Sequence, residues 1–191
     1  LHRVDRRQRQ MCIRDRPYAH EKAYSLVLLN NVFGGGASSI LFQNVREELG
    51  LCYTIYSYGQ PYLGVGINNI YTGVSKQSAD KALDVINQEL EKFAKEGISN
   101  EVLEINKEKI KASYILGLES TSSRMFSNAK SMLLQNKIKT QEEVIKRINN
   151  INADDINYVL DTCFKPGIIS SAYVGQDIEL SLIHISEPTR R

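Results

Sequence analysis

Cysteine and histidine are scarce in this sequence, which limits the disulfide and metal chemistry that it can support. Its 191 residues include three cysteines and three histidines. Cys52 and Cys163 are the only cysteines after residue 16, and no C-x-x-C spacing occurs, which argues against a disulfide framework and a structural zinc site. The motifs His-x-x-Glu-His and His-Glu-x-x-His are absent, so we expect no catalytic zinc centre from this chain alone. His20 and Glu21 are interpreted as a solvated pair near a helix start.

A long apolar run is also missing from the start of the chain. Residues 1–16 hold six arginines without apolar periodicity, so neither a signal peptide nor a membrane helix is predicted there. The segment MCIRDR and the terminal SLIHISEPTRR resemble translated sequencing-adapter read-through. We therefore expect residues 1–16 and 181–191 to be artefactual tails, outside a single folded domain that spans residues 17–180.

The charge balance changes once these tails are set apart. The formal net charge is +2, of which the two tails contribute +5, so residues 17–180 carry about −3. A basic arm that binds nucleic acid is the alternative interpretation of residues 1–16, and it depends entirely on those arginines. We therefore expect neither a nucleic-acid partner nor a membrane partner.

Hydrophobic residues make up 42% of the chain and charged residues 24%, which is enough for one ordinary globular domain. Helical spacing of apolar residues predicts a first helix over about 20–32. Two runs rich in β-branched and aromatic residues, 51–58 and 64–72, predict an antiparallel hairpin with its turn at 59–61. An apolar stripe from Ala79 to Phe93 predicts a helix that covers a sheet.

Capping patterns indicate the later helices. They are Ser99, the pair Thr140 and Glu143, and the pair Asn152 and Asp155. The polar cluster Glu119–Arg124 is interpreted as another helix start rather than a catalytic cluster, because it contains no evident pair of nucleophile and general base. A last strand is predicted over about 168–174. The order of elements indicates the α+β class: a two-layer sandwich with an antiparallel sheet covered on one face by several helices.

One arginine and one tyrosine are placed at a fixed turn. Arg46 falls near the end of a short predicted helix, Gly50 can adopt the left-handed conformation that stops it, and Tyr53 follows on a strand. A guanidinium binds carboxylates or carbonyls, and a phenol can donate a hydrogen bond to a developing oxyanion. The alternative is that Arg46 pairs with a nearby Glu and Tyr53 is ordinary strand packing.

Three consecutive glycines, Gly34, Gly35 and Gly36, precede that short helix. A phosphate-binding loop is disfavoured because no lysine follows at Walker spacing and the glycines follow a helix rather than a strand. The simpler interpretation is a helix stop, with Ser38 or Ser39 capping the next helix.

The segment GGGASSILFQNVREELGLCYTIYS resembles the second-domain signature of the pitrilysin and mitochondrial processing peptidase family of zinc metallopeptidases, which includes the insulin-degrading enzymes. The likeness continues at GLESTSSRM, residues 117–125, and at AYVG, residues 172–175, and is closest to bacterial processing-peptidase-like proteins. In that family the first domain carries an inverted zinc motif, His-x-x-Glu-His, and the second lends an arginine and a tyrosine to the site. These correspond to Arg46 and Tyr53. Ile40 departs from the pattern, since the family usually has an arginine there.

The resemblance implies a substrate-binding C-terminal domain of a zinc-dependent metalloendopeptidase. Tyr53 would be the oxyanion donor, Arg46 would bind substrate, and Gly34, Gly35 and Gly36 would lie near the substrate cavity. No metal or other cofactor is expected in this chain, because the zinc would be held by a separate N-terminal domain. The chain alone would then be inactive. The alternative is a non-catalytic scaffold or substrate-presenting subunit of the same family.

The resemblance also implies partners and a gap in the sheet. The expected partners are a peptide or unfolded protein substrate and the N-terminal zinc domain, with a homodimer as a further option. Reduced thiols favour a cytoplasmic location. In the family an edge strand precedes the first helix, and here the tail 1–16 occupies its place. We therefore expect that first edge strand to be missing, leaving an unpaired strand edge.

Overall fold

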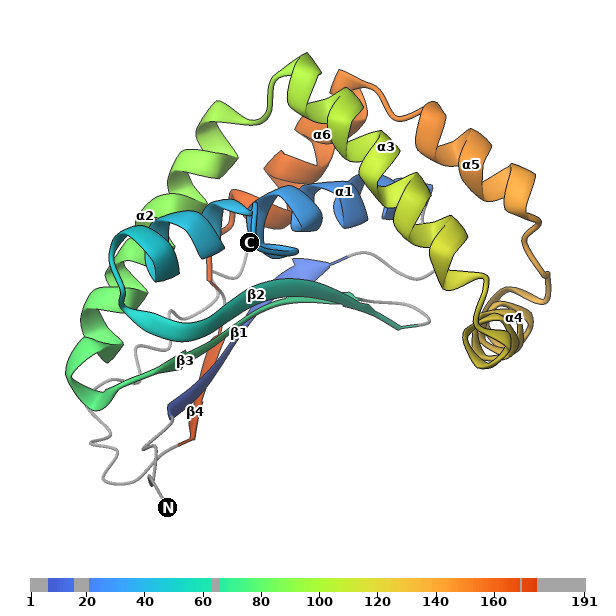
Figure 1. Cartoon of the computed structure of the whole chain (residues 1–191). Helices are drawn as coiled ribbons and strands as arrows, with labels where there is room; N and C mark the ends of the chain where they lie inside the picture. Colours follow the sequence, from blue (N-terminus) through green and yellow to red (C-terminus); the bar gives the residue numbers. More distant parts are fainter. Residues whose placement is uncertain (1–6, 16–20, 63–65, 169, 175–191) are drawn as a thin grey trace, which may run out of the picture.

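The chain folds into a sheet with a layer of helices on one of its faces (Figure 1). The computed structural model describes residues 7–15, 21–62, 66–168 and 170–174. His20 and the tail 181–191 lie outside the described residues. The expected α+β class and two-layer arrangement are confirmed. Among the described residues, none of the helices is both long and apolar enough to cross a membrane.

Four strands form the sheet, and every neighbouring pair is antiparallel. They are β1 Arg7–Asp15, β2 Cys52–Pro61, β3 Gly66–Val74 and β4 Ser170–Val174. The strand order is β2-β3-β1-β4, so β1 lies inside the sheet. It pairs with β3 from Arg7 opposite Val74 to Asp15 opposite Gly66.

The expectation of a missing strand is therefore wrong. Residues 7–15 fill a central position in the sheet, although they belong to the tail that we set apart from the folded domain. Strand pairing uses backbone N–H and C=O groups, and every residue of the segment RQRQMCIRD has both, because the segment contains no proline. The artefactual origin expected for residues 1–16 stays a prediction.

Residues 59–61 do not form the hairpin turn that we expected there. β2 continues through Gly59 and Gln60 to Pro61, and β3 begins at Gly66, so residues 59–61 are paired rather than turning. Proline has no N–H to donate, but it is tolerated at the end of an edge strand, and β2 is an edge strand of this sheet. The predicted turn at 59–61 is therefore wrong by a few residues.

The helices follow the predicted order closely. They are α1 Ala23–Gly34, a short π-helix Phe42–Glu48, a 3-10 turn Lys76–Ser78, α2 Ala79–Glu96, α3 Asn100–Gly117, α4 Thr121–Gln135, α5 Gln141–Asn149, α6 Ala153–Val159 and a second π-helical segment Leu160–Phe164. Ser99 and Ser120 cap α3 and α4 with their side chains. Both predicted capping boxes, Thr140 with Glu143 and Asn152 with Asp155, are present.

A cluster of three aromatic rings joins the helices above the sheet. Phe33 of α1 stacks on Phe93 of α2 with their centroids 5.0 Å apart. Phe164 packs edge-on against both, at 5.8 Å from Phe33 and 5.3 Å from Phe93. All three side chains are buried, in one core with Ile55 and Ile70 of the sheet. Aromatic contacts of this kind add to the stability gained from burying apolar area.

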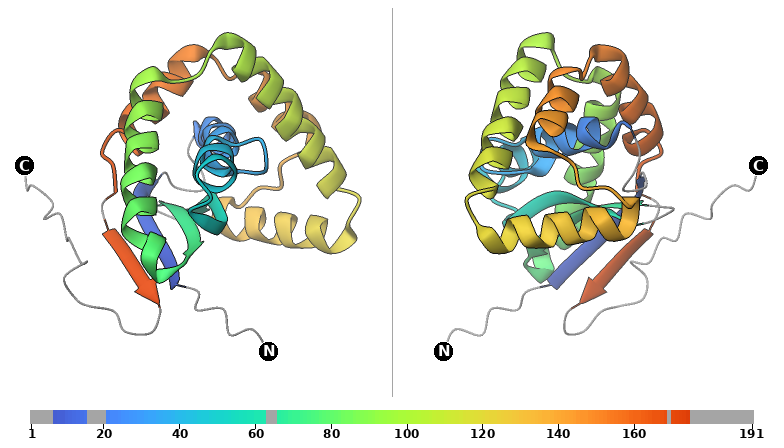
Figure 2. Two further views of the ribbon diagram at one scale, coloured as in Figure 1. Left: turned by 60° about the vertical axis from the view of Figure 1, so that its left-hand side comes forward. Right: turned by 90° about the vertical axis from the view of Figure 1, so that its right-hand side faces the viewer.

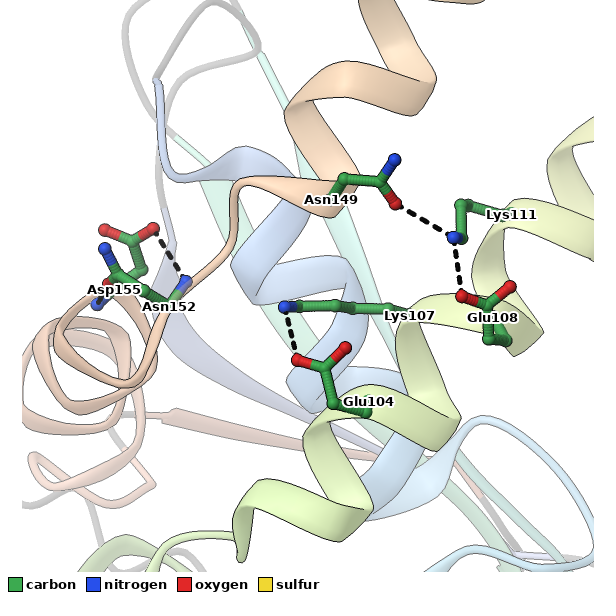
Figure 3. Close-up of polar contacts among 7 residues, drawn as sticks. All are labelled: Glu104, Lys107, Glu108, Lys111, Asn149, Asn152 and Asp155. Atoms are coloured by element: carbon green, nitrogen blue, oxygen red, sulfur yellow. Dashed lines mark hydrogen bonds and ion pairs between the residues drawn. The ribbon is translucent and has the colours of Figure 1, made fainter.

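Lysines connect the outer helices to their neighbours (Figure 3). Lys111 of α3 donates a hydrogen bond to Asn149 Oδ1 at the end of α5, at 2.8 Å, and to Glu108 Oε1 at 2.6 Å. One turn earlier on α3, Lys107 is buried and forms an ion pair with Glu104. Lys22, just before α1, pairs with Asp155 at the start of α6. The contacts of Lys111 with Asn149 and of Lys22 with Asp155 join segments that are distant in sequence.

The end of α1 approaches β2 very closely at Gly34. A Cβ atom added at this position would lie 2.5 Å from Ser57 N, 2.6 Å from Ser57 Oγ and 2.8 Å from Ser57 Cβ. Separations this short between a Cβ and a backbone nitrogen require the chain to move. Glycine is therefore needed at position 34 for α1 to pack on β2.

We expect Gly34→Ala to lower the free energy of unfolding by about 1–3 kcal/mol, because the new methyl group overpacks the contact with Ser57. Gly36→Ala is the matched control, since an added Cβ there meets nothing within 4 Å. We expect it to change the free energy of unfolding by no more than about 0.5 kcal/mol. Urea denaturation followed by circular dichroism measures both, and equal stability of the two variants would contradict the packing argument.

We expect Phe93→Leu to destabilise the chain by about 1–2 kcal/mol, because it removes two aromatic contacts and leaves unfilled volume beside Phe33 and Phe164. Phe126→Leu is the control, because Phe126 on α4 is 68% exposed. Its effect should stay within about 0.5 kcal/mol. The same denaturation experiment tests both, and a control as destabilising as Phe93→Leu would count against the aromatic cluster.

Candidate functional site

A tight loop between α1 and β2 positions the arginine predicted from the sequence. After α1 the chain turns at Gly35, whose N–H donates to Asn31 O at 3.2 Å. Ser39 Oγ donates to Gly36 O at 2.6 Å, and Gln43 Nε2 donates to Ala37 O at 2.5 Å. These hydrogen bonds hold the loop against the start of the short helix Phe42–Glu48. Figure 1 shows that helix, in cyan, directly before β2.

The expected capping by a serine side chain is wrong. The short helix has no side-chain cap. Ser39 occupies the right place, since its carbonyl accepts the N–H of Gln43 at 3.0 Å, but its hydroxyl is used by Gly36 O. Ser38 Oγ instead accepts a hydrogen bond from Lys109 Nζ at 3.0 Å, which ties the loop to α3. The hydroxyl groups of Ser38 and Ser39 therefore have other hydrogen-bond partners, which explains why the sequence pattern predicted a cap that does not form.

Gly50 ends the short helix as predicted. Its φ angle is +58°, and its N–H donates to Arg46 O at 3.1 Å. Leu51 N–H donates to Val45 O at 3.0 Å, which closes the turn. Glycine adopts this left-handed conformation without the steric cost that other residues pay. The chain then enters β2 with Arg46 and Tyr53 on the two sides of the turn.

A β-bulge determines the position of Tyr53. Cys52 pairs with Val74 and Thr54 pairs with Gly73, so Tyr53 is the extra residue between two adjacent pairs. A bulge of this kind bends the strand and redirects one side chain. Tyr53 is 68% exposed as a result. We found no sequence pattern that predicts this bulge, although we placed Tyr53 on the correct strand.

The Arg46 guanidinium lies between two aromatic rings. Its carbon is 4.4 Å from the centroid of the Phe42 ring and 5.8 Å from that of Tyr53. Stacking on aromatic faces orients a guanidinium while leaving its N–H groups at the edges. Arg46 Nε also lies 3.6 Å from Glu47 Oε1, so the alternative pairing with a nearby Glu exists, although Glu47 is largely exposed and such pairs contribute little. Phe42 was not anticipated from the sequence.

Arg46 and the three glycines line one hollow of about 370 Å³. Its floor is formed by β2 from Thr54 to Ser57, and Phe42 and Ala37 complete the wall. The structure therefore brings Gly34, Gly35, Gly36 and Arg46 together. Tyr53 is not among the lining residues, but its ring contacts Arg46 at the border of the hollow. Ile40, which departs from the family pattern, packs against the hydrophobic core.

The remaining side chains near the hollow offer little chemistry of their own. Cys52, next to Tyr53, is a buried free thiol. Burial raises the pKa of the Cys52 thiol, and the neighbouring Thr72 hydroxyl and Arg46 charge act in the opposite direction. A thiol with a raised pKa is a poor nucleophile at neutral pH. Among the described residues, no group of three His, Cys, Asp or Glu side chains could hold a metal ion, so these residues do not fit a zinc site.

Comparison with known proteins identifies the family. Residues 7–110 match the family model described as the peptidase M16 inactive domain. The chain is 42% identical over 138 residues to an uncharacterized zinc protease, YmxG, of Bacillus subtilis, covering 72% of this chain and 34% of that protein. An uncharacterized zinc protease of Streptomyces coelicolor is 31% identical over 139 residues, covering 73% of this chain and 30% of the relative. The chain thus spans about a third of the length of these relatives.

Solved structures show the same fold. A conserved protein from Enterococcus faecalis V583 superposes with a TM-score of 0.74 at 25% identity, covering 92% of this chain and 40% of that one. The peptidase M16 inactive domain from Pseudomonas fluorescens superposes with a TM-score of 0.70 at 17% identity, covering 83% of this chain and 38% of that one. The family match begins at Arg7, the first residue of β1, in the segment that we had excluded. With its sequence relatives named zinc proteases, the chain belongs to the peptidase M16 family as a C-terminal, inactive-type domain.

Proposed function

We propose that this chain is the substrate-binding C-terminal domain of a zinc-dependent metalloendopeptidase that hydrolyses peptide bonds. The observation that carries the proposal is the contact between Arg46 and the bulged, exposed Tyr53 at the rim of the glycine-lined hollow. The names of the sequence relatives support the reaction class. Since the chain covers only part of those relatives, the activity belongs to the complete protein.

The two side chains have complementary tasks in this proposal. Arg46 is held by Phe42 and Tyr53, and the planar fork of its guanidinium binds a carbonyl or carboxylate of the substrate. Tyr53 donates a phenolic hydrogen bond to the oxyanion that develops on the scissile carbonyl. Its exposure of 68% leaves its ring accessible to a substrate held by a second domain. Gly34, Gly35 and Gly36 would border the bound peptide.

The zinc would be held by a separate N-terminal domain, because the described residues do not form a metal site. This chain would then contribute binding and oxyanion stabilisation only, and it would be inactive alone. The buried free thiols of Cys52 and Cys163 support the further proposal of a cytoplasmic location.

A non-catalytic scaffold or substrate-presenting subunit is the second candidate. It is favoured by the description of the matching family model as an inactive domain. The two candidates differ in the sequence that accompanies this domain in the complete protein. A His-x-x-Glu-His motif in the N-terminal domain supports the peptidase, and its absence there supports the scaffold.

We expect Tyr53→Phe in the complete protein to lower kcat about a hundredfold, because loss of one oxyanion donor raises the barrier by roughly 3 kcal/mol. Tyr158→Phe on α6 is the matched control, since Tyr158 is 42% exposed and does not line the hollow. Its kcat should stay within about twofold of the parent. Steady-state kinetics on a fluorogenic peptide measures both, and an unchanged kcat for Tyr53→Phe would remove the assigned role.

We expect Arg46→Lys in the complete protein to raise KM about tenfold, because an ammonium group cannot form the two parallel hydrogen bonds of a guanidinium. Arg147→Lys on α5 serves as the control, since Arg147 is exposed and does not line the hollow. The same kinetic assay compares them. If kcat/KM for Arg46→Lys equals that of the control, Arg46 does not bind substrate.

A further inference from the structure

A second cavity, of about 450 Å³, lies between α1 and the distal half of β2. We call it the α1–β2 pocket. Leu26, Val27 and Tyr58 are among its apolar walls, and Asn30, Ser57 and Lys139 are among its polar ones. Its size falls within the range of small-ligand sites, and mostly apolar walls with a few polar groups are typical of such sites. It is large enough for one bulky side chain and the adjoining peptide group.

Asn30 lines this pocket and carries an unused hydrogen-bond acceptor behind its wall. The residue is only 6% exposed. Its backbone carbonyl accepts a hydrogen bond from Ser57 Oγ at 3.2 Å, which holds α1 against β2. Its side-chain Oδ1 is buried and has no hydrogen-bond partner among the described residues. Buried amide oxygens are nearly always hydrogen-bonded, so this atom is an unsatisfied acceptor, and a ligand N–H reaches it once the Asn30 side chain turns toward the pocket.

Positive charge gathers at one end of the pocket. Lys139 Nζ lies 5.7 Å from the centroid of the Tyr24 ring. Lys139 and Tyr24 also line an adjoining cavity of about 240 Å³, to which α4 contributes Arg124. The two cavities therefore share Tyr24 and Lys139, and Lys139 and Arg124 both line the second one.

The surroundings of Lys139 favour an anion there. Burial lowers the pKa of Lys139; the charges of Arg147 and Lys137 act in the same direction, and that of Glu143 opposes them. Glu143 is itself paired with Lys137, Nζ to Oε1, at 2.6 Å. Glu142 is the other acidic group near this cavity, and it acts on Tyr114. A carboxylate beside Lys139 and Arg124 would offset the positive potential that these groups create.

We propose that the α1–β2 pocket binds the C-terminal residue of a peptide. The apolar side chain enters the pocket, the Asn30 side chain turns so that its Oδ1 accepts the peptide N–H of that residue, and the carboxylate lies toward Lys139 and Arg124. The choice of a peptide rests on the proposed function, and it names the end of the substrate that this domain holds. Gly35 and Ser57 line both this pocket and the hollow beside Arg46, so the two sites adjoin one another.

Direct binding to the 191-residue chain tests the proposal without any catalytic readout. The probe is a fluorescein-labelled hexapeptide that ends in a free phenylalanine, titrated by fluorescence polarisation. We expect it to bind at least tenfold more tightly than the same peptide with a C-terminal amide, and than one ending in aspartate. Octanoate, which has an apolar chain and a carboxylate but no amide, should compete at least tenfold more weakly.

Three variants locate the contact. Lys139→Met should remove the preference for the free acid over the amide while leaving the affinity of the amide peptide unchanged. Val27→Trp should weaken both peptides about tenfold by filling the pocket, at a residue that is already 53% exposed. Lys146→Met on α5 is the control, because Lys146 is exposed and lines neither cavity, and it should change nothing.

Several outcomes would overturn the proposal. Equal affinity for the free acid and the amide would show that the pocket does not bind the carboxylate. Strong competition by octanoate would show that the site binds a simple carboxylic acid rather than a peptide. If Lys139→Met still binds the free acid more tightly than the amide, the carboxylate does not bind at Lys139. These results are separable from the proposed function, because the effect of Tyr53→Phe on kcat in the complete protein is measured independently of this binding.

Discussion

The contact between Gly34 and Ser57 is the constraint on which the rest of the domain depends. It brings the end of α1 onto β2 at a distance that leaves no room for a side chain. Ser57 also binds the carbonyl of Asn30 one turn earlier on α1, so two contacts fix the helix on the strand. The hollow beside Arg46 lies on one side of this contact and the α1–β2 pocket on the other. A single close approach therefore sets the geometry of both candidate sites.

The helix layer holds that approach in place from above. Phe33 lies next to Gly34 in the sequence, and its ring is fixed by Phe93 and Phe164 from two other helical segments. The ion pair between Lys22 and Asp155 acts at the opposite end of α1. α1 is thereby held at both ends. Because the helix is fixed, the hydrogen-bonded loop that follows it can hold Arg46 in a defined position.

Local features of the fold could be predicted from the sequence, and features that depend on distant partners could not. Gly50 and the capping boxes at Thr140 and Asn152 act through their own backbone neighbourhood, so their residue types were sufficient evidence. Arg46 and Tyr53 were likewise placed on the correct helix and strand. The pairing of β1 with β3 and β4 joins segments about 60 and 160 residues away, and composition alone pointed away from it.

The site was predicted only in part for the same reason. The bulge at Tyr53 arises from the register between two strands, which no single residue encodes. Ser39 is a local exception, because its hydroxyl donates to Gly36 O three residues earlier instead of capping the helix. Asn30 and Lys139 are more than a hundred residues apart and meet at one pocket only through the packing of α1 against the segment before α5. Sequence spacing could not have related them.

Helix α4 has a consequence for how stability is distributed through the domain. It lies at the periphery of the fold, connected by α3 and α5 (Figure 2), and Ser131 is its only buried residue. A segment with so little buried area opens locally at a small free-energy cost, while the aromatic cluster on the far side stays intact. Arg124 lies on this loosely held helix. A ligand that contacted both Arg124 and Lys139 would therefore slow amide hydrogen exchange along α4. Binding at the α1–β2 pocket would then increase the order of a helix that does not line that pocket.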